Sequence, residues 1–165
     1  MVQPETNGPP FDGNGFIIAT IMAPGLALAI FYLGAGPKDL ALGPGGVGGL
    51  IGSFLMLWLI VSGWGVLPSL TFGGLVLAVI QRMPWRGRPG PLVFMSGGMA
   101  AAGLYVLMGL GASGPAPGVA LFFAPWATPD FRGPSAGRED WWLVASLLLA
   151  GAGAGLIYAA FVKRG

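Results

Sequence analysis

The chain has 165 residues, enough for one domain, but only 8% of them are charged, whereas about 25% is usual in soluble domains. Hydrophobic residues make up 55% of the chain, and the mean hydropathy is +0.77. A soluble fold of this size would have too few charged side chains to cover its surface, so the composition excludes an ordinary soluble globule. Eight Lys and Arg residues and a net charge of +2 are also too little for a nucleic-acid-binding surface.

The residue types that carry most protein chemistry are missing or misplaced. The chain has no cysteine and no histidine, which excludes thiolate sites, the usual haem, zinc and copper ligands, and the commonest proton shuttle at neutral pH. All six Asp and Glu residues fall outside the spans predicted below. Proton pumps and ion-coupled transporters usually hold an ionisable group near the middle of the membrane, and the predicted spans have none. We therefore predict that the chain is not an enzyme and that it binds no metal or cofactor.

Four long stretches contain no Asp, Glu, Lys or Arg, namely 13–37, 40–81, 89–129 and 141–162. Each is long enough to cross the hydrocarbon core of a bilayer, about 30 Å thick, which takes roughly 20 helical residues. The sequence therefore predicts an all-α integral membrane protein, with residues 1–165 forming a single transmembrane domain. The first predicted span is 15–34, in which Pro24 should kink the helix.

The second stretch is the main ambiguity, because one helix over 47–80 would be roughly 50 Å long at about 1.5 Å per residue. Glycines within 62–65 permit a tight turn, and Pro68 suits the first turn of a new helix. We therefore favour two short spans, 46–61 and 66–81, joined by a hairpin. The alternative is a single kinked, strongly tilted helix.

The rest of the chain predicts a loop at 82–91, a span at 92–111, a connection at 112–140 and a last span at 141–162. Together these elements form a small bundle of five, alternatively four, transmembrane helices. Cytoplasmic loops carry an excess of Lys and Arg. Five spans place six of the eight basic residues inside, and four spans place five inside because Lys38 changes side. In both arrangements the arginine loop and the C-terminus are cytoplasmic, and the small size suggests a bacterial inner (plasma) membrane.

Small residues recur at a spacing of four, which aligns them on one helix face and lets two helices approach closely. We expect these faces to be helix-packing surfaces. The pairs are Gly48 with Gly52, Gly98 with Ala102, and Gly151 with Gly155.

Two other segments are candidates for binding. The connection 112–140 has a concentration of aromatic side chains that would lie in the membrane interface, fold over the bundle, or dock a partner. The loop 82–91 has three arginines that either set the topology or bind an anionic lipid headgroup. The aromatic residues are Phe122, Phe123, Trp126 and Phe131, and the arginines are Arg82, Arg86 and Arg88.

The sequence thus favours a non-catalytic role as an accessory, assembly or stabilising subunit of a larger membrane complex, or as a homo-oligomer. The expected partners are membrane lipids and other membrane subunits or a second copy of the chain, and not nucleic acid. The alternative is a facilitator or channel for a small neutral or lipidic solute, with Ser, Thr and Tyr side chains along its path.

Overall fold

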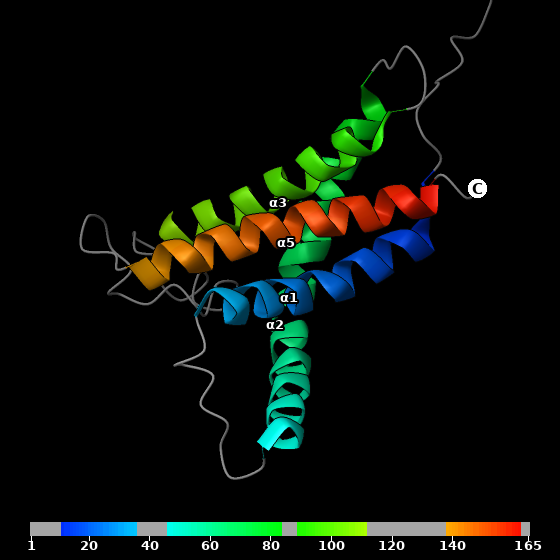
Figure 1. Ribbon diagram of the computed structural model, residues 1–165. Coiled ribbons are helices and arrows are strands. Elements are labelled where there is room, and N and C mark those ends of the chain that lie inside the picture. The colour runs from blue at the N-terminus through cyan, green and yellow to red at the C-terminus, as the bar shows by residue number, and fades with distance from the viewer. Residues whose placement is uncertain (1–10, 36–45, 84–88, 112–137, 163–165) are drawn as a thin grey trace, which may run out of the picture.

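The structure is a computed structural model that describes residues 11–35, 46–83, 89–111 and 138–162. These residues form α1 (Gly13–Ala35), α2 (Gly46–Arg82), α3 (Pro91–Gly111) and α5 (Arg138–Val162), and no strand occurs among them (Figure 1). Four helical segments within them are long and apolar enough to cross a membrane. The all-helical class predicted from the uncharged stretches is confirmed. The four segments are Gly13–Gly34, Gly65–Arg82, Pro91–Gly109 and Trp141–Val162.

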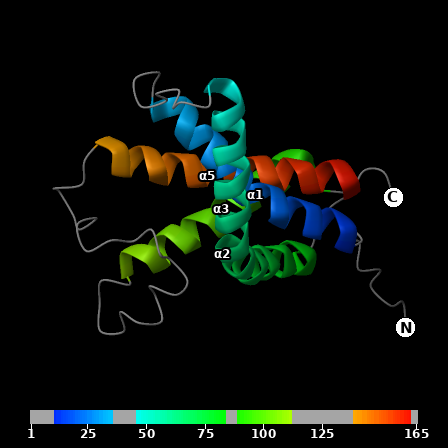
Figure 2. The ribbon, with the colours of Figure 1, turned by 90° about the horizontal axis from the view of Figure 1, so that it is seen from below.

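The predicted hairpin within 62–65 is wrong. These residues are helical, and α2 runs without interruption over 37 residues with Pro68 inside it. Proline lacks the backbone N–H and its ring crowds the preceding turn, so it bends a long helix without ending it when the flanking residues continue the helix. Figure 2 shows the consequence, because the first part of α2 (cyan) and its second part (green) point in different directions.

α5 lies between α1 and α3 and contacts both of them (Figure 1). α5 is antiparallel to α1, because Gly15 near the start of α1 meets Phe161, and Gly34 near its end meets Trp142. α2 also lies against α1 and α3, whereas its described backbone does not come close to that of α5. The four helices therefore form a ring in which α2 and α5 stand opposite each other.

The core lies towards the end of the bundle where α1 begins and α5 ends. Phe94 of α3 packs edge-on against Tyr158 of α5, with ring centroids 5.3 Å apart. Leu77 and Ile80 of α2 and Ala19 of α1 complete this buried cluster. All four helices thus contribute to one core, which supports a single domain for the part of the chain that the structure describes.

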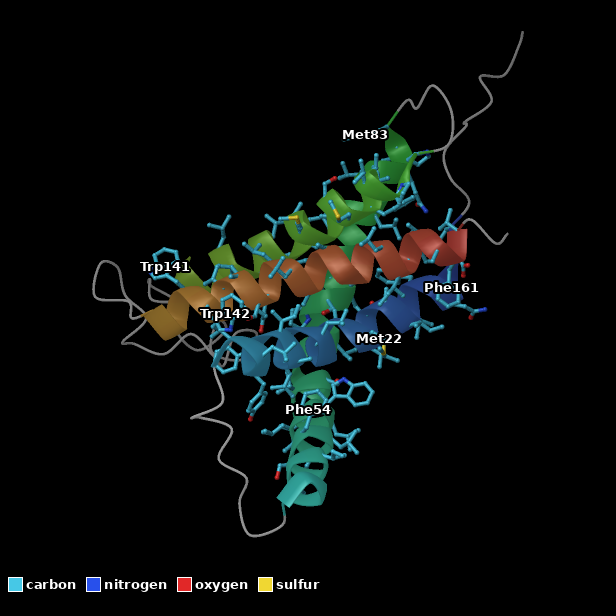
Figure 3. The ribbon with its side chains drawn as sticks, viewed as in Figure 1. Met22, Phe54, Met83, Trp141, Trp142 and Phe161 are labelled. Atoms are coloured by element: carbon cyan, nitrogen blue, oxygen red, sulfur yellow. The ribbon has the colours of Figure 1, made fainter. Side chains whose placement is uncertain are left out.

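The start of α1 and the end of α5 lie at the same end of the bundle, because Gly15 contacts Phe161. The end of α2 and the start of α3 lie there as well, and Figure 3 places Met83 and Phe161 towards that end. A chain whose first and last helices end on one side crosses an even number of times. This arrangement, with four helical segments of spanning length, agrees with the four-span alternative and not with the preferred five-span arrangement.

We expect reporters fused to the N-terminus and to the C-terminus to locate on the same side of the membrane. A reporter inserted between residues 112 and 137 should locate on the opposite side. This segment follows the end of α3 and precedes the start of α5, so one helix separates it from the end of the bundle where the two termini lie. Protease protection or a compartment-dependent reporter enzyme measures both positions. N- and C-terminal reporters on opposite sides would restore the five-span arrangement.

Candidate functional site

A backbone-to-backbone contact joins α3 to α5 through three glycines. Gly98 and Gly151 meet backbone to backbone, and Gly155 meets the carbonyl of Phe94. A Cβ added at Gly151 would stand 2.8 Å from the Cβ of Ala102, closer than real Cβ atoms approach. Because the seam has no room for a side chain, these small residues set the distance between α3 and α5.

Hydrogen bonds join α1 to α5 near both ends. At one end the Asp12 carboxylate caps α1 by accepting the Gly15 N–H at 2.9 Å, and the Asp12 N–H donates to the Tyr158 hydroxyl at 3.3 Å. At the other end the indole Nε1–H of Trp142 donates to the carbonyl of Phe31 at 3.0 Å. Trp142 thus joins α5 to α1.

Between the helices lies a cavity of about 620 Å³, lined by residues of all four helices and partly open to the surroundings. Thirteen of its thirty-one lining residues are glycine or alanine, among them Ala23, Ala101 and Ala154. None of the described residues that line it is charged. Pockets of this size, roughly 300 to 1,000 Å³, commonly hold small ligands.

Four polar side chains line the cavity, and three other hydroxyl groups of the predicted spans have partners within their own helices. Thr71, Ser96 and Ser146 donate hydroxyl hydrogen bonds to carbonyls three or four residues earlier in their own helices, so these three hydroxyl groups are satisfied locally. The polar cavity residues are Thr20, Ser69, Tyr105 and Tyr158.

The first part of α2, residues 46–63, which we call the α2 arm, is largely exposed, and only Ile60 and Val61 near its end line the cavity. Met56 is 68% exposed and Leu59 is 71% exposed. The small residues predicted to pack, Gly48 and Gly52, have no described atom within 4 Å of an added Cβ. Around Gly48, Gly52, Met56 and Leu59 the α2 arm therefore has an apolar surface that no described helix covers.

The contact between the α2 arm and α1 leaves buried polar groups unpaired, whereas hydrogen bonds join α5 to α1. Trp58 packs against Gly25, where an added Cβ would stand 2.8 Å from the indole Cδ1. Its Nε1–H and the hydroxyl of Ser62, one turn later, are buried without a hydrogen-bond partner among the described residues. Such groups destabilise an apolar interior by about 1 to 3 kcal/mol each, so this crossing is weaker than the seams around α5.

The remaining predicted site residues are only partly visible. Arg82 ends α2 and is exposed, whereas Arg86 and Arg88 lie outside the described residues. The aromatic docking residues Phe122, Phe123, Trp126 and Phe131 also lie outside them. No group of three or more Asp, Glu, His or Cys side chains suited to a metal ion occurs in the part of the chain that is described.

The cavity was missed by sequence reasoning, although one signal pointed to it. Ala19, Ala23 and Ala27 recur every four residues on α1, and all three line the cavity. A row of small side chains can mark close helix packing or an internal space, and spacing alone does not separate the two.

No protein-family model, no curated protein and no solved structure matches this chain.

We expect Gly151→Ala to lower the free energy of unfolding by about 1 to 3 kcal/mol, because its new methyl group overpacks the α3–α5 seam. Gly103→Ala is the matched control, since its Cβ would stand 3.9 Å from Leu148, an ordinary contact. In a helix the control substitution should be neutral or stabilising by up to about 1 kcal/mol. Thermal unfolding of the detergent-solubilised protein measures both, and equal melting temperatures for the two variants would contradict a closed seam.

Proposed function

We propose that this chain is a non-catalytic multi-pass membrane protein that acts as an accessory, assembly or stabilising subunit of a larger membrane complex or of a homo-oligomer. The observation that carries the proposal is the apolar surface of the α2 arm around Gly48, Gly52, Met56 and Leu59, which no other described helix covers. The bacterial inner membrane, with the arginine loop and the C-terminus in the cytoplasm, is the proposed location.

The length of the α2 arm argues against its acting as a span by itself. Its apolar helix, Ile51–Gly63, is shorter than the 18 residues that the four span-length segments reach or exceed. A lone crossing helix needs roughly 20 residues, and a helix that is apolar all round is stable only in an apolar environment. A neighbouring membrane protein supplies that environment without requiring the arm to reach both membrane surfaces.

The glycines of the α2 arm favour a protein over lipid as its neighbour. In the α3–α5 seam, glycines allow backbone contact and are fully used within the chain. Gly48 and Gly52 have the same spacing and face open space. A second helix can approach such a face closely and gain dispersion contacts that flexible lipid chains make less well.

A facilitator for a lipidic solute is the second candidate, and the cavity favours it. Its lining is almost entirely apolar, so it suits a hydrocarbon better than a hydrated neutral solute. Flux of a fluorescent lipid between leaflets of reconstituted vesicles, compared with protein-free vesicles, distinguishes a facilitator from a subunit that transports nothing.

The subunit proposal predicts that the protein, extracted from its native membrane in mild detergent, migrates with other membrane proteins or as a multiple of its own mass. Gly52→Leu should reduce the larger species to the lone chain, because the leucine side chain fills the face that the neighbour approaches. Native gels and mass spectrometry of the copurifying chains provide the readout.

Ser53→Leu is the matched control, because it adds similar bulk to an exposed neighbouring position that points about 100° away around the helix. It should leave the larger species intact. Both variants should keep wild-type helicity and melting temperature in circular dichroism, since neither new side chain meets the bundle. A wild-type protein that migrates only as a lone monomer would refute the proposal.

A further inference from the structure

The cavity exists because α5 packs closely against α1 and α3, whereas the backbone of α2 lies at a distance from α5. α5 meets α3 at backbone contact through Gly151 and Gly155, whereas the described backbone of α2 comes close only to those of α1 and α3. Small side chains on the inner faces of α1, α3 and α5 then leave the space between α5 and α2 unfilled. The space follows from the helix arrangement and is not a gap beside one misplaced side chain.

The cavity is long as well as wide. Phe16 and Phe31 of α1 both line it, and their separation of fifteen positions corresponds to about 22 Å of helix at about 1.5 Å per residue. One leaflet of the hydrocarbon core is about 15 Å deep, half of roughly 30 Å. A narrow molecule lying along α1 would therefore extend past the middle of the bilayer.

The lining decides the chemistry of that molecule. Water would find only four polar side chains along this length, and one of them, Tyr158, already accepts the Asp12 N–H. Leaving the space empty would forfeit dispersion contacts along every wall. A hydrocarbon chain makes those contacts without losing hydrogen bonds, and an apolar wall is what a hydrocarbon requires.

From this arrangement we infer that the cavity is a binding site for one long hydrocarbon chain of a membrane lipid, lying along α1 between α2 and α5. The site goes beyond the proposed role as a subunit and does not depend on it, because Gly48, Gly52, Met56 and Leu59, which carry that role, do not line the cavity. Acyl chains and isoprenoid chains share the required chemistry, and the experiment distinguishes these two sources.

The first test is native mass spectrometry of the wild-type protein purified in mild detergent, followed by extraction and fragmentation of any retained molecule. We expect about one lipid per chain, with fragments that identify an acyl or an isoprenoid chain. Retention of no lipid, or of a mixture with the composition of the bulk membrane, would overturn the inference.

The second test fills the cavity from two walls. In the double variant Ala101→Leu with Ala154→Leu, the leucines extend into the space from α3 and from α5. We expect at least a tenfold loss of the retained lipid. The matched control is Ala100→Leu with Ala160→Leu, which adds the same bulk to exposed positions of the same two helices and should retain lipid as the wild type does. Equal retention in both double variants would overturn the inference.

A third measurement needs no substitution and so does not depend on whether the filled variant folds. The wild-type protein in nanodiscs is irradiated with a phosphatidylcholine that carries a diazirine on its palmitoyl chain. Adducts on peptides containing Ala23, Ala101 or Leu147, competed by excess unlabelled lipid, would place a chain in the cavity. Adducts confined to exposed residues such as Leu107 and Leu149 would show that the chain stays outside.

Discussion

The backbone contact between α3 and α5 is the interaction on which the rest of the bundle depends. Among apolar helices in an apolar solvent, association rests on close packing and hydrogen bonds because burial of hydrocarbon adds little. Gly98, Gly151 and Gly155 supply that packing, and the Asp12–Tyr158 and Trp142–Phe31 hydrogen bonds hold α1 against the other side of α5. α5 is thereby fixed between two neighbours, and the position of α2 decides how the remaining space is used.

α2 combines two roles because it bends without ending. Its second part places Leu77 and Ile80 in the common core beside Phe94. Its first part diverges from the other helices (Figure 2). Large apolar side chains such as Met56 and Leu59, and the helix face with Gly48 and Gly52, are therefore exposed. The same bend keeps α2 away from α5, so the α2 arm and the cavity are two consequences of one change in helix direction.

Both proposals use the only interactions that these surfaces offer. The α2 arm has bulky apolar side chains and small residues, which suit a second apolar helix. The cavity has an uncharged lining with few polar groups, which suits a hydrocarbon. Neither surface, in the part of the chain that the structure describes, brings together an acid, a base and a nucleophile.

The sequence by itself determined where helices form, because backbone hydrogen bonds in a helix are local and uncharged stretches set their extent. The expected span 92–111 corresponds to α3, Pro91–Gly111, and the expected span 15–34 lies within α1, Gly13–Ala35. Only the tertiary structure decided that α2 continues as one bent helix and that a cavity remains between α2 and α5. It also decided that Gly98 and Gly151 contact each other, whereas Gly48 and Gly52 have no contact among the described residues. These outcomes depend on how surfaces distant along the chain fit together, and identical local spacings of glycine, alanine and proline are compatible with either result.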